Sequence, residues 1–192
     1  MEVTIKSYRD NYEDFLHLCH VAGYDVNNPA SHNHDIRRYT EPGSLHKQVA
    51  DGLYYGVSGD YNLVYYDGTL AGGAGYYRYD SQYVLACTRA YVMPEFRKQY
   101  VTQNLVAFQL RELQSIGERA PKKMMITFNK YNSRIYRALI NRPGLIPELW
   151  STFRPVGLRT INYTEQYCWE REINEKFDAQ QSPELVSNQQ RV

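Results

Sequence analysis

The stretch that decides the fold begins with Tyr83-Val-Leu-Ala-Cys-Thr-Arg-Ala-Tyr-Val92 and continues into a helical run from Glu95 to Glu118. Residues 83–92 show no split between an apolar and a polar face, which is typical of a strand buried on both sides. The run that follows repeats its apolar residues at near-helical spacing and therefore predicts a long helix. Arg97 and Lys98 lie where strand gives way to helix, and a helix N-terminus favours anions. We therefore expect an anion site at this loop.

A second strand and a second helix follow. Lys122-Lys-Met-Met-Ile-Thr-Phe-Asn129 is a short apolar run in a basic frame, and the apolar spacing from Tyr131 to Asn141 suggests a helix. Strand, helix, strand and helix form a crossover unit, which requires two parallel strands. Ligands bind where such strands end, so the site is expected at the ends of residues 83–92 and 122–129.

At these residues the chain resembles the GNAT superfamily of N-acetyltransferases. Pro94-Glu-Phe-Arg97-Lys-Gln-Tyr100-Val-Thr102 aligns without a gap with the family's acetyl-coenzyme A loop, Pro-Glu-Tyr-Arg-Gly-Lys-Gly-Ile-Gly. Asn129-x-x-Asn132-x-x-Ile135-Tyr136 has the spacing of the family's Asn-x-x-Ala-x-x-Leu-Tyr motif. The two motifs stand in register across one crossover unit, and the resemblance covers roughly residues 62–144.

The loop departs from the family's pattern in one respect. Lys98, Tyr100 and Thr102 stand where the family has glycines, which give the backbone room to approach a pyrophosphate. The backbone N–H donors remain, since every non-proline residue keeps one. We expect either weaker coenzyme A binding or a rearranged loop.

The resemblance implies an α/β (α+β) fold with a mixed six- to seven-stranded sheet, flanked by helices on both faces. The strands at 83–92 and 122–128 should be parallel and splayed apart. Acetyl-coenzyme A is the implied cosubstrate: N–H groups at the end of the first strand polarise its thioester, loop amides hold its pyrophosphate, and an Asn contacts its pantetheine arm or shapes the splay. The implied binding residues are Tyr91, Val92, Arg97, Lys98, Gln99, Tyr100, Val101, Thr102 and Asn129.

The resemblance also assigns catalytic roles. Tyr136 would be the general acid that protonates the departing thiolate, although a Tyr beside Ile135 is equally compatible with core packing. Arg89 could pair with a carboxylate of the substrate or form an ion pair within the sheet. Residues 83–92 contain no acidic side chain, so Glu41 and Asp80 are the candidate bases, with a water relay as the alternative.

We therefore expect an N-acetyltransferase that uses acetyl-coenzyme A to modify a primary amine of a small molecule or a protein. One alternative is a GNAT-like protein that has lost turnover and serves in binding or assembly, because the loop glycines and the family's Glu are missing. A second alternative is transfer of a different acyl group. A homodimer is also compatible with the sequence.

Composition argues against several other classes. Lys and Arg number 22 against 21 Asp and Glu, so no global charge attracts nucleic acid or a membrane surface. The cysteines at 19, 87 and 168 do not form a disulfide framework and are interpreted as buried reduced thiols. His17, His20, His32 and His34 lack the tight grouping of metal ligands, so no metal is expected. With no apolar segment suited to a signal peptide or a membrane span, we expect a cytoplasmic protein.

The remaining elements flank this unit within one domain, residues 1–173, followed by a polar tail at 174–192 that we expect to be flexible. Asp67-Gly68 predicts a two-residue hairpin turn, and the glycines at 72, 73 and 75 are interpreted as close backbone approach or a bulge. Further strands are expected at 2–7, 153–162 and 165–172. An N-terminal amphipathic helix should present Tyr12, Phe15, Leu16 and Cys19 on its apolar face.

Overall fold

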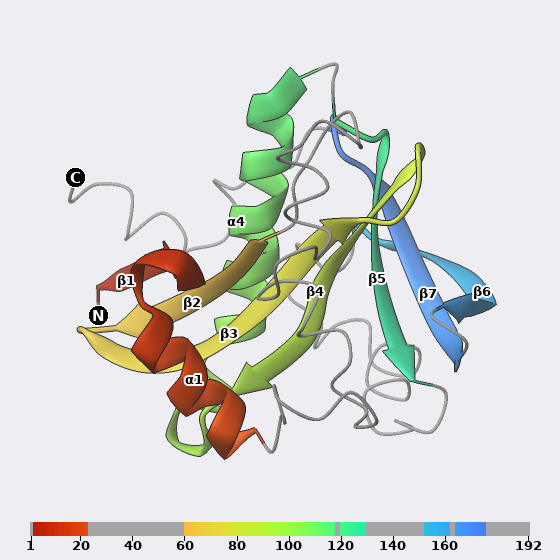
Figure 1. The fold of residues 1–192 in the computed structure, drawn as a ribbon. Coiled ribbons are helices and arrows are strands. Elements are labelled where there is room, and N and C mark those ends of the chain that lie inside the picture. Colours follow the sequence, from red (N-terminus) through yellow and green to blue (C-terminus); the bar gives the residue numbers. More distant parts are fainter. Residues whose placement is uncertain (1, 23–59, 118–119, 130–151, 162–163, 176–192) are drawn as a thin grey trace.

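The described part of the chain forms one seven-stranded sheet. The structure is a computed structural model that describes residues 2–22, 60–117, 120–129, 152–161 and 164–175. The strand order is β1-β2-β3-β4-β5-β7-β6, which confirms the predicted mixed sheet (Figure 1). The strands are β1 Val3–Ser7, β2 Asp60–Tyr66, β3 Thr69–Arg78, β4 Tyr83–Val92, β5 Lys123–Asn129, β6 Arg154–Ile161 and β7 Thr164–Glu172.

The first four strands are antiparallel, and the β2–β3 turn is the one that the sequence predicts. Asp67 and Gly68 both have positive φ, 48° and 79°, which is the backbone of a two-residue turn matched to strand twist. Beyond this turn, Val64 pairs with Gly72 and Tyr65 with Leu70, so β3 carries one extra residue in a bulge.

A helix connects β4 to its parallel neighbour β5. This helix, α4, spans Val101–Ile116 and starts six residues later than the sequence predicts. The reason is local: Pro94–Phe96 form a short 3-10 helix, η2, and Arg97 is extended, so the α-helical hydrogen bonds begin only after the loop. β7 then inserts between β5 and β6, antiparallel to both, which confirms the predicted closing strands.

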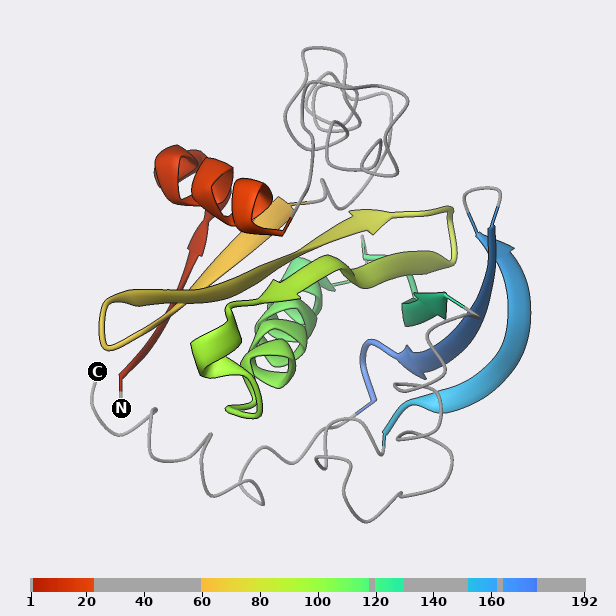
Figure 2. The same ribbon diagram turned by 90° about the horizontal axis from the view of Figure 1, so that it is seen from below.

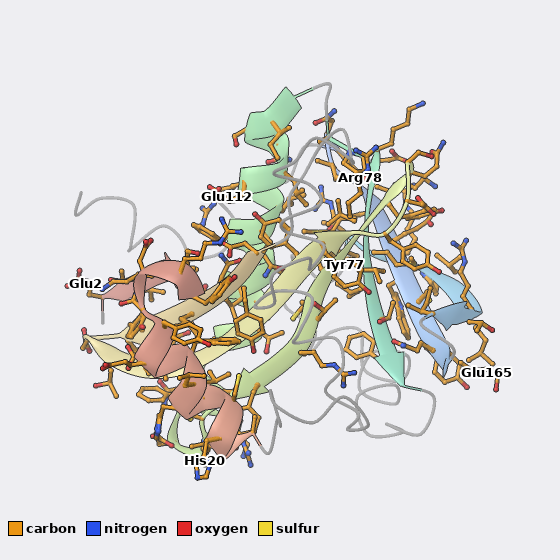
Figure 3. The ribbon with its side chains drawn as sticks, viewed as in Figure 1. Glu2, His20, Tyr77, Arg78, Glu112 and Glu165 are labelled. Atoms are coloured by element: carbon orange, nitrogen blue, oxygen red, sulfur yellow. The ribbon has the colours of Figure 1, made fainter. Side chains whose placement is uncertain are left out.

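Helices cover both faces of the sheet, as expected. Figure 2 shows α1, Tyr12–Val21, on one face and α4 on the other. The core on the α1 side includes Tyr77, which is labelled in Figure 3. Its other buried members include Tyr8, Phe15, Leu18, Cys19, Tyr61, Leu63, Tyr65, Leu85 and Met125. The core on the α4 side includes Val64, Tyr66, Val84, Ala86, Val106, Ala107, Leu110, Leu113, Met124 and Ile126.

The predicted apolar face of α1 is partly wrong. Phe15 and Cys19 are buried, but Tyr12 is 48% exposed and Leu16 is 38% exposed. Leu18 is buried instead. Phe15, Leu18 and Cys19 pack into the core on this face of the sheet, so the buried line of the helix passes through Leu18 and leaves Tyr12 and Leu16 at its edge.

The end of β7 is held by an arginine on the α4 side of the sheet. Arg171 donates to the hydroxyl of Thr152 at 2.8 Å and to the carbonyl of Glu175 at 2.6 Å. Glu175 is therefore held against the domain, while the rest of the predicted tail, 176–192, lies outside the described residues. Among the helices that are described, none is long and apolar enough to cross a membrane.

Candidate functional site

The two parallel strands separate halfway along their length. β4 pairs with β5 only from Tyr83–Ala86, opposite Lys123–Ile126. Figure 1 shows the two strands side by side at one end and diverging toward their arrowheads. The predicted parallel pairing and splay are therefore confirmed.

Two bulges in β4 accompany this separation. The pairing of β4 with β3 shifts register twice, between Gly73 and Gly75 and between Gly75 and Tyr77, and each shift leaves one extra residue on β4. Cys87 and Arg89 have positive φ, 53° and 49°, at these two places. A bulge bends its strand and increases the local twist, so the second half of β4 turns away from β5.

A tyrosine from β2 supports the second bulge. The hydroxyl of Tyr61 donates to the carbonyl of Arg89 at 2.9 Å. Its ring passes over Gly73 of β3, where an added Cβ would lie 2.8 Å from the ring and 3.0 Å from the carbonyl oxygen of Asn62. Only glycine leaves space for this crossing, which confirms that a glycine of this strand permits close approach.

The last residues of β4 lie against the start of α4. Tyr91 pairs with Gly73 and Val92 with Gly72, so both predicted donor positions are at the splayed end of the strand. A Cβ on Gly72 would come within 2.5 Å of the carbonyl oxygen of Tyr91 and 3.1 Å of Val101. The close contact of strand and helix therefore depends on this glycine, and it brings the loop 97–102 beside the end of β4.

The loop keeps glycine-like backbone geometry without glycines. Lys98 and Tyr100 have φ of 75° and 59°, in the left-handed region that glycine adopts without strain. Both side chains are exposed, so they point away from the packed interior. Thr102, in the first turn of α4, has no such requirement. Two of the three residues that replace the family's glycines therefore adopt a backbone that favours glycine, and weaker coenzyme A binding or a rearranged loop stays a prediction.

The start of α4 offers an electropositive end. Its N-cap, Tyr100, makes no side-chain cap hydrogen bond, and its first turn has no acidic residue. Arg97 and Lys98 are exposed beside it, and the Arg97 Nε donates to the carbonyl of Val92 at 3.4 Å. Uncapped backbone N–H groups and two cations make this end of the helix suited to an anion.

Two loop amides are already engaged. The N–H of Arg97 donates to the carbonyl of Pro94 at 3.3 Å. The N–H of Gln99 donates to the carbonyl of Phe96 at 3.2 Å, so its predicted contact with a pyrophosphate would have to come from its side chain. The Gln99 side chain donates in turn to the carbonyl of Glu95 at 3.1 Å. Lys98, Tyr100 and the first residues of α4 are therefore the loop's remaining candidate backbone donors.

A buried tyrosine that sequence reasoning missed fixes the loop from behind. The hydroxyl of Tyr66, on β2, donates to the carbonyl of Gln99 at 2.6 Å and accepts from the Asn104 side chain at 2.9 Å. Its ring meets that of Phe96 edge-on, with centroids 5.7 Å apart. The loop and the first turn of α4 are therefore held to the same side chain. Nothing in the sequence separates Tyr66 from the other 18 tyrosines.

Several candidates cannot be placed. Glu41 and Tyr136 lie outside the described residues. Asn129 is the last residue of β5, opposite Gln166, but its side chain also lies outside what is described. Arg89 is half-buried at the second bulge, and its proposed contact with a substrate carboxylate stays a prediction.

Asp80 is excluded as the base. Its carboxylate accepts from the backbone N–H groups of Gln82 and Tyr83, at 2.7 Å and 2.8 Å, and so closes the turn between β3 and β4. That turn lies at the far end of β4, and the eight residue-to-residue steps from Tyr83 to Tyr91 span roughly 25 Å of strand. The carboxylate is therefore a turn residue remote from the splay.

The thiols and histidines of the described residues show no catalytic or metal-binding arrangement. Burial raises the pKa of the Cys19 and Cys87 thiols to about 12, which keeps both protonated and unreactive. No group of His, Cys, Asp and Glu side chains that could hold a metal ion occurs in this part of the chain. His17 and His20 are exposed, with His20 near the end of α1 (Figure 3).

Comparison with known proteins identifies the fold. No protein-family model and no curated protein matches the chain. Among solved structures, a Desulfovibrio desulfuricans protein assigned to the GNAT family of acetyltransferases matches with a TM-score of 0.59 and 12% identity, over 89% of this chain and 99% of that one. Ard1 of Thermoplasma volcanium matches with a TM-score of 0.55 and 12% identity, over 91% and 100%.

A third solved structure is similar in the same way. It is the ribosomal-protein-S18-alanine N-acetyltransferase of Escherichia coli, with a TM-score of 0.54 and 15% identity over 92% of this chain and 97% of that one. All three are distant in sequence, and each match covers between 89% and 92% of this chain. This chain has the fold of the GNAT N-acetyltransferases.

Proposed function

We propose that this protein is an N-acetyltransferase that transfers an acetyl group from acetyl-coenzyme A to a primary amine of a small molecule or a protein. The observation that carries the proposal is the splay of β4 from β5 after Ala86, directly beside the uncapped and cationic start of α4. The splay and the cationic helix start both lie at the end of β4. This combination suits a long ligand that carries an anionic group near one end and a reactive group further along.

The described residues suit coenzyme A in two respects. Arg97 and Lys98 are exposed at the start of α4, where phosphate oxygens would accept from the helix N–H groups and from both side chains. Tyr91 and Val92 lie at the end of β4, where pairing with β5 has ceased, and a backbone N–H there is proposed to donate to a thioester carbonyl oxygen.

The thioester supplies an acyl carbon that is open to attack by an amine. In the transfer, a C–N bond forms, the C–S bond breaks, the amine loses one proton and the departing thiolate gains one. Tyr136, which stands in the family's motif, is proposed as the donor of the second proton. Glu41 or a water relay is proposed as the acceptor of the first. Arg89 is proposed to position an acceptor that carries a carboxylate.

Calorimetry with acetyl-coenzyme A tests the binding part of this proposal. The double variant Arg97→Ala with Lys98→Ala should bind at least roughly tenfold more weakly, since a hydrogen bond to a charged group contributes about 1.5–3 kcal/mol. Arg111→Ala is the matched control: it removes an exposed cation from the middle of α4 and should leave the affinity unchanged. No binding by the unaltered protein at millimolar ligand would overturn the proposal.

A panel of amines then separates transfer from binding alone. Release of free thiol in the presence of a subset of amines is expected, with an acetylated amine as the product. Binding of acetyl-coenzyme A without thiol release for any amine would favour a GNAT-like binding protein. Faster release from a longer acyl thioester would favour a different acyl donor.

A further inference from the structure

A buried glutamine on α4 is hydrogen-bonded to three strands at the level where β4 leaves β5. Gln109 is 0% exposed. Its Oε1 accepts from the backbone N–H of Cys87 on β4 at 3.0 Å. Its Nε2 donates to the Asn62 side chain on β2 at 3.2 Å and to the carbonyl of Ala74 on β3 at 3.1 Å. One side chain therefore ties α4 to β2, β3 and β4.

The orientation of this amide is fixed by its partners. Both Nε2–H groups have acceptors, and the oxygen faces a donor, so a flipped amide would place an NH₂ group against the Cys87 N–H. Asn62 is itself buried, which makes the arrangement a satisfied polar network inside an apolar core. Such a network fixes one geometry more strictly than apolar packing alone.

The bond to Cys87 falls at the point where the strand changes direction. Cys87 is the first residue of β4 beyond its pairing with β5, and its φ of 53° belongs to the first bulge. A buried backbone N–H that lacks an acceptor is costly. The bulged conformation at Cys87 is consequently stable only where another group accepts this hydrogen bond, and Gln109 is the group that does so.

We propose that Gln109 is a positioning residue for acyl transfer. By accepting from the Cys87 N–H it holds the first bulge of β4 and thereby directs the strand from Thr88 to Val92 away from β5. The claim about the acyl group rests on the proposed function, in which backbone donors near Tyr91 receive the thioester carbonyl. Gln109 touches neither donor nor acceptor and acts through the strand.

Three substitutions separate this role from ordinary packing. Gln109→Met removes all three hydrogen bonds with little change in volume. Gln109→Glu keeps an oxygen for Cys87, and burial keeps the carboxylic acid neutral, so its O–H still serves Asn62 or Ala74. Gln114→Met is the matched control: the same change on the same helix removes one hydrogen bond, from Nε2 to the carbonyl of Ile173 at 2.7 Å, away from the bulge.

Two measurements are made on each protein. The first is amide hydrogen exchange at Cys87, which reports the bulge without any ligand. The second is the ratio of the affinities for acetyl-coenzyme A and S-ethyl-coenzyme A, a thioether that lacks the carbonyl oxygen. This ratio reports the carbonyl's donors, because every contact to the nucleotide is shared by the two ligands.

We expect Gln109→Met to exchange the Cys87 amide about 5- to 150-fold faster and to lose its preference for acetyl-coenzyme A. Gln109→Glu and Gln114→Met should stay close to the unaltered protein in both measurements. Retention of the preference by Gln109→Met would overturn the positioning role, as would equal affinity for the two ligands in the unaltered protein.

The experiment also covers two other failures. If Gln109→Met does not fold, two other results would still overturn the proposal. One is rapid exchange of the Cys87 amide in the unaltered protein. The other is loss of the preference for acetyl-coenzyme A in the Gln114→Met control. If neither ligand binds the unaltered protein, the proposed function itself fails. That result differs from binding of both ligands with no effect of Gln109.

Discussion

The two halves of the β4–β5 pair are built on different principles. In the first half, residues 83–86 and 123–126 exchange ladder hydrogen bonds, and Val84, Leu85 and Ala86 are buried. In the second half the ladder has ended, two residues of β4 have positive φ, and the side chains are mostly half-buried. The first half is sheet, and the second is a strand held in shape by groups from other elements.

The groups that hold the second half and the loop after it come from two elements, β2 and α4. The hydroxyl of Tyr61, on β2, donates to the carbonyl of Arg89. The side chain of Gln109, on α4, accepts from the N–H of Cys87. Tyr66 fixes the following loop. Backbone strain of about 1–3 kcal/mol per unusual residue persists only where the surroundings over-determine it. The comparison indicates that strain is concentrated where a ligand is proposed to bind.

The largest expected effect concerns chemistry at the splayed half. Tyr136→Phe should lower turnover by about 10²- to 10⁴-fold, because general acid catalysis contributes in that range. Acetyl-coenzyme A affinity should hardly change, since only an interaction formed in the transition state is lost. Thiol release, with an amine found in the panel, provides the measurement. Full activity of Tyr136→Phe would show that Tyr136 takes no part in the mechanism. If the variant loses only about 1 kcal/mol in its free energy of unfolding, the Tyr136 hydroxyl is a hydrogen-bonded group of the core.

A substitution at Gly72 should disturb the splayed half through its packing. In Gly72→Ala the new Cβ would lie 2.5 Å from the backbone oxygen of Tyr91, so β3, β4 or α4 must shift. Overpacking of this kind costs about 1–3 kcal/mol, and the loop beside α4 should lose coenzyme A affinity as well. Urea unfolding and calorimetry measure the two effects. If stability falls but coenzyme A affinity does not change, the conformation of the loop does not depend on the contact at Gly72.

The paired half should respond in stability alone. Tyr83 donates to Glu170 at 2.9 Å, and Lys123 lies 2.5 Å from the other carboxylate oxygen. Tyr83→Phe should lower the free energy of unfolding by about 1 kcal/mol without changing coenzyme A affinity. A loss of affinity in this variant would contradict the division into two halves.

The same cluster predicts a pH dependence. Burial opposes ionisation of Glu170, but hydrogen bonds from Lys123 and Tyr83 outweigh it and hold the pKa of Glu170 below its ordinary value. A lowered folded-state pKa contributes stability above the unfolded-state value, about 4.3, and that contribution disappears as the pH falls through the folded-state pKa. As the pH is lowered below about 4.3, the free energy of unfolding should therefore fall more steeply for the unaltered protein than for Glu170→Gln. Urea unfolding at a series of pH values measures this difference.

The smallest expected effect is a gain in stability in the loop. Tyr100 is 49% exposed and has a φ of 59°, so Tyr100→Gly relieves strain and gives up little packing. The free energy of unfolding should rise by up to about 1 kcal/mol. Thr102→Gly is the control, because the same change within the first turn of α4 should cost about 1 kcal/mol. Equal losses in both variants would show that Tyr100 makes contacts that matter more than its φ.

The structure confirms the predicted elements that depend on residues close together in the sequence. The turn at Asp67-Gly68, the crossover from β4 to β5 and the two closing strands β6 and β7 follow from turn residues, apolar spacing and strand-forming residues within short windows. Errors arose where another element intervened: the apolar face of α1 rotated toward Leu18, and α4 began after the 3-10 turn at Pro94–Phe96.

The candidate site divides in the same way. The loop Arg97–Thr102 could be proposed from the sequence because its residues are consecutive and match a known pattern, whereas Tyr61, Tyr66 and Gln109 could not. Gln109 does leave a weak signal, since it stands four residues from both Leu105 and Leu113 on the buried side of α4. A polar residue at an apolar helical position implies a buried partner without saying which one.

By itself the sequence determined the elements, their order and the turn geometry, because hydrogen bonds and side-chain periodicity within a few residues decide these. Tertiary structure alone decided that Cys87 and Arg89 adopt positive φ inside a strand. Such a backbone is unfavourable locally and becomes stable only when Gln109 and Tyr61, from distant segments, satisfy its polar groups. That dependence on partners 22 and 28 residues away is why local pattern could not reveal it.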